Sequence, residues 1–119
     1  MVLIVGGAGS GKRTFARSLG YTDADMADGL LDEKKVICGL EHMVFANPEG
    51  AEQLLPELEK KEVVICCEVG SGVIPYDKAE RAGREATGRL CVLLAQKASC
   101  VVRMVSGIPT VIKGQLPCR

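Results

Sequence analysis

Near its start the chain carries a glycine-rich segment that ends in a lysine, a combination that can bind phosphate. Residues 6–12 read Gly-Gly-Ala-Gly-Ser-Gly-Lys and match the pattern G-x-x-x-x-G-K. In this pattern the glycines let successive backbone N–H groups turn inward around an anion, while Lys12 reaches the terminal phosphates. An apolar run, residues 2–5, precedes the segment and a helical pattern follows it, which is the context that the motif requires. The segment therefore predicts a phosphate-binding loop (P-loop) that binds GTP or ATP.

The residue after the lysine departs from the motif. A serine or threonine usually stands there and its hydroxyl holds Mg²⁺, whereas this chain has Arg13. Arg13 can contact phosphate but cannot ligate a cation, and Thr14 lies about 100° further around a helix, so its hydroxyl should point elsewhere. The departure therefore affects Mg²⁺-dependent turnover more than nucleotide binding, and we assign no residue as a metal ligand. The candidate nucleotide-binding residues are Gly6, Gly7, Ala8, Gly9, Ser10, Gly11, Lys12, Arg13 and Thr14.

Short apolar runs mark the expected strands. Val36–Cys38 and Val63–Cys67 are wholly apolar, as in strands of a parallel sheet that is covered on both faces. Two more strands are expected near the end of the chain, over Cys100–Val105 and residues 110–112, with a tight connection over residues 106–109. The run at residues 2–5 completes the set.

Helical patterns alternate with these strands. We expect helices over residues 11–19 and 77–97, and a third that starts after Asn47 as N-cap and is kinked or divided by Pro56. Residues 21–35, rich in Asp and small residues, are expected to form a loop with one helical turn around residues 26–31. This alternation predicts an α/β fold with a mainly parallel sheet and an antiparallel edge hairpin at its C-terminal end.

Composition limits the class of protein. The 119 residues predict a single domain, residues 1–119, and the balance of 15 Lys+Arg against 15 Asp+Glu argues against a nucleic-acid partner. The first apolar run is too short for a signal peptide or a membrane span, so we expect a cytoplasmic protein with no membrane partner. Six cysteines without C-x-x-C spacing, mostly inside apolar runs, predict reduced packing residues rather than metal or redox sites.

A second motif follows the expected strand Val63–Cys67: residues 68–75 read Glu-Val-Gly-Ser-Gly-Val-Ile-Pro. Together with the P-loop, with Ala-Thr-Gly-Arg-Leu at 86–90 and with Val-Ser-Gly-Ile-Pro at 105–109, it resembles the adenosylcobinamide kinase / adenosylcobinamide-phosphate guanylyltransferase family. The resemblance covers residues 1–19 and 63–113 and identifies the chain as a short, divergent member.

This resemblance implies a fold and an activity. The fold is a three-layer, RecA-like P-loop NTPase. Such enzymes use ATP or GTP to phosphorylate the aminopropanol hydroxyl of adenosylcobinamide, and then attach GMP during cobalamin assembly. The implied partners are a nucleotide, a corrinoid substrate and further copies of the chain in a homo-oligomer.

Three residues are candidates for catalysis: Lys12, Glu68 and Glu41. Glu68 is expected at the carboxyl end of a strand, where it could orient water or Mg²⁺ or accept a hydroxyl proton. The alternative is that Glu68 only ties down the following glycine turn through backbone N–H groups. Cys38 and Gly39 stand where the family pattern leads us to expect an acid at the end of the second strand, and Glu41 is close enough to compensate.

The middle of the chain is shorter than the family pattern. Only residues 20–35 separate the P-loop helix from the next strand, whereas family members carry several dozen more residues there, including a histidine that becomes guanylylated. We do not transfer that role to His42, the one histidine of the chain. The sequence thus leaves open a phosphotransferase that retains only the kinase half, a non-catalytic nucleotide-binding subunit, and a small-molecule kinase unrelated to corrinoids.

Overall fold

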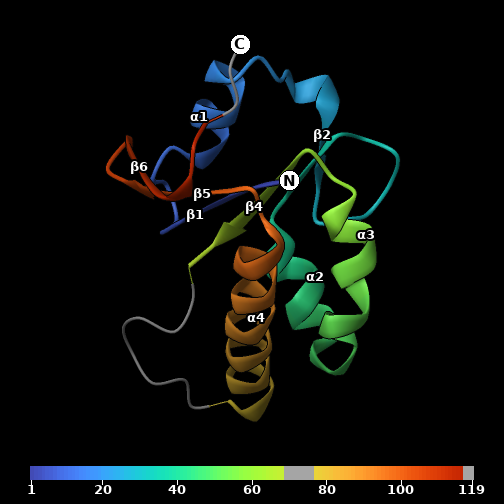
Figure 1. The fold of residues 1–119 in the computed structure, drawn as a ribbon. Helices are drawn as coiled ribbons and strands as arrows, with labels where there is room; N and C mark the ends of the chain where they lie inside the picture. The colour runs from blue at the N-terminus through green and yellow to red at the C-terminus, as the bar shows by residue number, and fades with distance from the viewer. Residues whose placement is uncertain (69–76, 117–119) are drawn as a thin grey trace.

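A computed structural model describes residues 1–68 and 77–116 of the chain (Figure 1). Its strands form one six-stranded sheet in the order β2-β3-β4-β1-β5-β6, in which all neighbours are parallel except β5 and β6. This confirms the predicted α/β class, the mainly parallel sheet and the antiparallel edge hairpin. The strands are β1 (Val2–Gly6), β2 (Met26–Asp28), β3 (Val36–Cys38), β4 (Val63–Cys67), β5 (Cys100–Val105) and β6 (Ile108–Gly114).

Helices cover both faces of this sheet, which gives the three layers of a P-loop NTPase fold. Figure 1 shows α1 on one side of the sheet and α2, α3 and α4 on the other. The α-helices are α1 (Lys12–Ser18), α2 (Leu40–Ala46), α3 (Leu55–Glu59) and α4 (Lys78–Lys97), and two 3₁₀ helices span Asp23–Asp25 and Pro48–Leu54.

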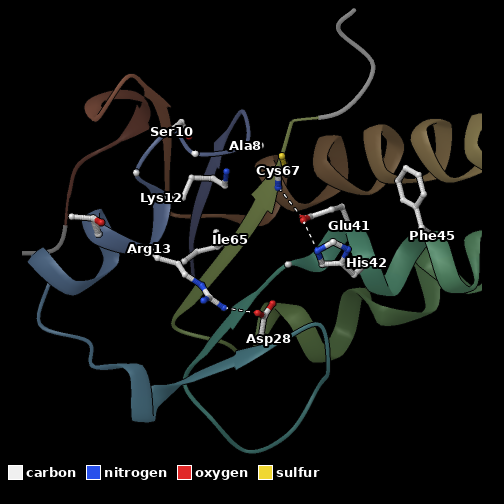
Figure 2. Close-up of a pocket in the computed structure, with 14 residues that line it drawn as sticks. Ala8, Ser10, Lys12, Arg13, Asp28, Glu41, His42, Phe45, Ile65 and Cys67 are labelled. Carbon is white, nitrogen blue, oxygen red and sulfur yellow. Dashed lines mark hydrogen bonds and ion pairs between the residues drawn. The ribbon is translucent and has the colours of Figure 1, made fainter. Parts of the chain in front are cut away.

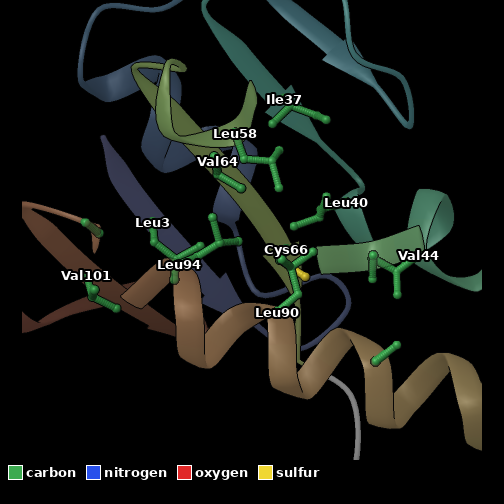
Figure 3. Close-up of a cluster of buried hydrophobic side chains, with 13 residues drawn as sticks. Leu3, Ile37, Leu40, Val44, Leu58, Val64, Cys66, Leu90, Leu94 and Val101 are labelled. Carbon is green, nitrogen blue, oxygen red and sulfur yellow. The ribbon is translucent and has the colours of Figure 1, made fainter. Parts of the chain in front are cut away.

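The apolar core is divided by the sheet into two clusters. Leu3 of β1 packs with Leu40 and Leu90 in the cluster under α2 and α4 (Figure 3), whereas its neighbour Ile4 packs with Ala16 of α1 on the opposite face. Successive side chains of a strand alternate between the two faces, and here both faces are buried. The uninterrupted apolar runs of the central strands follow from this double burial.

Two elements were not predicted. The stretch expected as a loop contains the edge strand β2, whose Met26 and Asp28 pair with Val36 and Cys38 of β3. The helical turn expected around residues 26–31 is wrong, because this pairing makes Met26–Asp28 a strand and the helical turn lies before it, at Asp23–Asp25. The residues after β3 form helix α2, which starts at Leu40. Gly39 makes this helix start possible, because it has a left-handed backbone (φ 64°) that turns the chain from strand to helix.

Two local predictions need correction, and a third is met. Asn47 precedes a 3₁₀ helix without capping it through its side chain, and the helical stretch is divided as predicted, with Pro56 in the first turn of α3. The hairpin connection is shorter than predicted. Ser106 and Gly107 alone form the turn, with φ 50° and 78°, as in a type I′ turn. β6 therefore begins at Ile108.

Three further observations on the described residues concern the start of α4, the cysteines and membrane spans. Asp77 caps α4 by accepting a hydrogen bond from the backbone N–H of Ala79 at 2.8 Å. Five of the six cysteines are described and all five are free thiols; Cys118 lies outside the described residues. Within residues 1–68 and 77–116, no helix is both long and apolar enough to span a membrane.

Candidate functional site

The P-loop (residues 6–12) connects β1 to α1 at the centre of the sheet. Gly9 and Gly11 adopt left-handed conformations with φ of 70° and 93°. Gly6 is required for a different reason, because an added Cβ would lie 2.5 Å from Ser10 Oγ and 2.7 Å from the carbonyl oxygen of Met104. The loop thus folds tightly over its own first residue.

Both neighbouring strands hold the P-loop by backbone hydrogen bonds. The N–H of Glu68, directly after β4, donates to the Gly6 carbonyl at 2.7 Å. The N–H of Gly107, in the β5–β6 turn, donates to the Ser10 carbonyl at 2.9 Å. The loop conformation is therefore fixed by the sheet and the hairpin.

A cavity of about 570 Å³ opens beside the P-loop, and Figure 2 shows the residues that line it. Its size falls within the range of small-molecule sites. Lys12 lines it and donates from Nζ to the Gly7 carbonyl at 2.7 Å, and Thr14 lines it as well. Ser10 also lines the cavity, and its hydroxyl is buried without a hydrogen-bond partner. The loop residues from Ala8 to Thr14 thus face one concave space.

Arg13 forms an ion pair across this cavity with Asp28, the last residue of β2. The distance from Nη2 to Oδ2 is 2.7 Å, as Figure 2 shows. The neighbouring Cys38 and Asp28 raise the pKa of Arg13, and burial raises the pKa of the Cys38 thiol. A Cβ at Gly39 would lie 2.6 Å from Asp28 Oδ1. The carboxylate of Asp28 therefore occupies the space beside Gly39, where an acid from β3 was expected.

Glu41, near the start of α2, shares the cavity with Lys12. Its Oε1 accepts a hydrogen bond from the backbone N–H of Cys67 at 2.9 Å, and its Oε2 lies 3.4 Å from His42 Nε2. The side chain of Glu41 is only 17% exposed, whereas that of His42 is 74% exposed. Glu41 thus links α2 to the end of β4 and presents a carboxylate to the cavity.

Glu68 lies in a different environment. Arg103 of β5 holds its carboxylate through two hydrogen bonds, of 2.8 and 3.3 Å. Glu68 lines a smaller cavity of about 320 Å³ together with residues 7–10 of the P-loop, and this cavity does not include Lys12. The rest of the motif, with Val69, Gly70, Gly72 and Pro75, lies outside the described residues, so the proposed tie between Glu68 and the glycine turn stays untested.

The residues of the main cavity do not fit Mg²⁺ as P-loop proteins usually hold it. The hydroxyl position is Arg13, the position of the acid is Gly39, and the nearby carboxylate of Asp28 is already paired with Arg13. Across residues 1–68 and 77–116, no three His, Cys, Asp or Glu side chains are grouped to hold a metal ion.

Sequence reasoning missed Asp28 because its place depends on the pairing of β2 with β3. The only local signal was the sequence Met-Ala-Asp-Gly, in which two apolar residues precede a turn-forming pair. Arg103 was missed for a similar reason: it is a charged residue inside an apolar strand, and its partner Glu68 comes from another strand's end.

A comparison with family models supports the family resemblance. No curated protein matches the chain in a sequence search. The family model described as cobinamide kinase / cobinamide phosphate guanyltransferase matches residues 24–112, about three quarters of the chain. The match begins after the P-loop, so the motif at residues 6–12 is an independent observation, while Asp28, Glu41 and Glu68 lie inside the matched part. The chain therefore belongs to the cobinamide kinase / cobinamide phosphate guanyltransferase family.

Proposed function

We propose that this protein binds GTP or ATP at the P-loop and transfers the γ-phosphate to the hydroxyl of a cobinamide-type corrinoid. The observation that carries the proposal is Lys12 at the start of α1, which lines a cavity beside the glycine loop in a chain of this family. Loop amides and Lys12 would neutralise the charge of the phosphoryl group during transfer.

The transfer breaks the bond between the γ-phosphorus and the oxygen that bridges it to the β-phosphate, and forms a bond to the substrate oxygen. The proton of the substrate hydroxyl needs an acceptor. Of the two candidate carboxylates, Glu41 is better placed, because it lines the same cavity as Lys12. Glu68, held by Arg103 beside residues 7–10, is better suited to position the loop. Guanylyl transfer is not part of this proposal, since no described residue has been assigned as its acceptor.

A non-catalytic nucleotide-binding subunit is the second candidate function. The observation that favours it is the ion pair of Arg13 and Asp28, which stands where a catalytic cation is usually held. Transfer of labelled γ-phosphate to cobinamide separates the two functions, because only the first predicts a phosphorylated product.

Calorimetric titration with GTP and with ATP tests the shared nucleotide site. We expect the wild-type protein to bind at least one of them and Lys12→Ala to lose affinity by about tenfold or more, since a charged phosphate contact is removed. Arg17→Ala is the matched control, because Arg17 is on the same helix and pairs with Asp23 at 2.8 Å without lining the cavity. A wild-type protein without affinity for either nucleotide refutes the proposal.

We further propose that the protein acts in the cytoplasm as a homo-oligomer. Its free thiols fit a reducing compartment. The β5–β6 hairpin exposes large apolar side chains, including Val105, Ile108 and Ile112, and a hydrophobic edge strand of this kind favours association. Light scattering should report more than one copy for the wild type and fewer for Ile112→Lys; a monomeric wild type would contradict this part.

A further inference from the structure

We propose that Arg13 takes the place of the divalent cation at this site, so that the chain binds a nucleoside triphosphate without Mg²⁺, and that Asp28 is the positioning residue that holds Arg13 for this purpose. The inference rests on the proposed nucleotide site and specifies how that site neutralises the phosphates. It concerns two residues of this chain: one departs from the P-loop motif, and the other lies on a strand that the motif does not include.

The first argument is the position of Arg13. It directly follows Lys12, where other P-loop proteins place the hydroxyl that coordinates Mg²⁺. Its side chain lines the same cavity as Lys12 and is 45% exposed, so it is accessible to a ligand there. A guanidinium has five N–H donors in a fixed planar arrangement, and the contact with Asp28 Oδ2 leaves donors for phosphate oxygens.

The second argument is that the usual cation ligands are replaced together. Gly39, where an acid was expected, has no side chain, and a Cβ there would lie 2.6 Å from Asp28 Oδ1. The carboxylate in that space comes from β2 instead and pairs with Arg13 at 2.7 Å. A carboxylate that would help to hold a metal thus holds an arginine, as Figure 2 shows. Arg13 supplies the positive charge, and Asp28 at the end of β2 orients it.

The third argument concerns the P-loop itself. Ser10 is 9% exposed, lines the cavity, and its hydroxyl is buried without a partner. The hydroxyl lies against Gly6, where an added Cβ would be 2.5 Å from it, so the backbone of the loop is packed tightly beneath the cavity. Lys12 and Arg13 therefore supply donors around a space that this loop also lines, which fits an anionic phosphate chain.

Calorimetric titration with GTP and ATP, in excess Mg²⁺ and in EDTA, tests the inference. The wild-type protein is expected to show the same Kd in both buffers within about twofold. Arg13→Ser restores the usual hydroxyl and frees Asp28, so it should bind about tenfold or more weakly in EDTA and recover affinity in Mg²⁺. Arg17→Ser is the matched control, since it removes an arginine that is paired with Asp23 on the same helix, and should behave like the wild type.

Asp28 is tested by two variants of different charge. Asp28→Asn should weaken GTP binding in EDTA about threefold or more while leaving the unfolding midpoint close to that of the wild type, because the ion pair is largely exposed. Asp28→Glu, which restores the carboxylate, should recover affinity. Equal binding by Asp28→Asn and the wild type overturns the positioning role.

The remaining outcomes separate this inference from the proposed function. Wild-type binding that is lost in EDTA and present in Mg²⁺ overturns the inference and leaves the proposed function standing. Unchanged binding of Arg13→Ser in EDTA also overturns it. An absence of binding in both buffers overturns the nucleotide site and the inference with it.

Discussion

Replacing Glu41 separates a structural role of this carboxylate from a chemical one. Its Oε1 accepts from the Cys67 N–H at 2.9 Å. The strand β3 pairs with β4 only at Val63 and Val64, so Cys67 lies beyond the end of β3 and Glu41 takes the place of a neighbouring strand. Glu41→Ala removes this acceptor, whereas Glu41→Gln keeps a carbonyl oxygen of similar reach and removes only the charge.

The size of the effect follows from burial. Glu41 is 17% exposed at its side chain, so a Cys67 N–H that loses it is poorly compensated by water. Such a loss costs about 1–3 kcal/mol. At about 2.1 cal/mol/K per residue, the entropy of unfolding of a chain of this length is about 0.25 kcal/mol/K, and a loss of about 2 kcal/mol lowers Tm by about 8 °C. For Glu41→Gln we expect a loss below about 1 kcal/mol, or about 4 °C.

Thermal unfolding followed by circular dichroism measures these shifts, and labelled phosphate transfer measures turnover in the same samples. The matched control is Glu57→Ala, which removes an exposed ion pair with Lys60 of 3.4 Å and should shift Tm by about 2 °C or less. If Glu41 is also the proton acceptor, Glu41→Gln keeps most of the stability and loses turnover. A Tm of Glu41→Ala no lower than that of Glu57→Ala would refute the structural reasoning.

Three further predictions concern the glycines of the P-loop, the buried Lys61 and the stability of the protein at alkaline pH. Gly6→Ala should lower Tm or prevent folding because its Cβ meets backbone at 2.7 Å, whereas Gly7→Ala, with nothing within 4 Å, should melt like the wild type. Lys61→Met should lower the free energy of unfolding by about 1–3 kcal/mol in a urea titration, because Lys61 is only 8% exposed and donates to the carbonyls of Asp32 and Lys34. Lys60→Met, at an exposed position, should change it little. Burial raises the pKa of Cys38 above its ordinary value of 9.0, so the native state keeps a proton that the unfolded chain releases. Its contribution to stability is therefore complete below pH about 9 and is lost at higher pH, and alkaline melts of Cys38→Ala should decline less steeply than those of the wild type.

The central sheet could be predicted because its strands are buried on both faces. Val63–Cys67 is apolar without interruption, and its observed bounds are those expected. β2 could not be predicted in the same way, since Met26–Asp28 is only three residues long and lies at the edge of the sheet. A strand this short is stabilised by its neighbour, and the pairing with β3 is a non-local property. The sequence around Met26–Asp28 therefore indicated an Asp-rich loop, because the pairing that makes it a strand is not visible in the local pattern.

In the candidate site, too, the contiguous motif could be predicted and the residues brought in by strand pairing could not. Its phosphate loop is a contiguous motif, and Gly9, Gly11 and Lys12 line one cavity as such a motif implies. Asp28 is separated from Arg13 by fifteen positions of sequence and reaches it only because β2 joins the sheet next to β3. The Arg13 departure was visible in the sequence, but its partner was not. The ion pair of Glu68 and Arg103 was missed for the same reason. Its residues come from the end of β4 and from β5, which are distant in sequence and are brought close because they lie on either side of β1.

A side-chain cation differs from a metal ion in what it implies for turnover. An interaction that is equally strong with the bound triphosphate and with the transition state raises affinity and leaves kcat unchanged. Arg13 is held by Asp28 before any ligand arrives, and a fixed guanidinium accelerates transfer only if its contacts strengthen as charge develops on the γ-phosphate. The proposed role of the ion pair in nucleotide binding is therefore compatible with both candidate functions. The kinase function additionally requires that Arg13 or Lys12 follow the phosphoryl group, so the decision between the two functions lies in the turnover of Arg13 variants and not in their affinity.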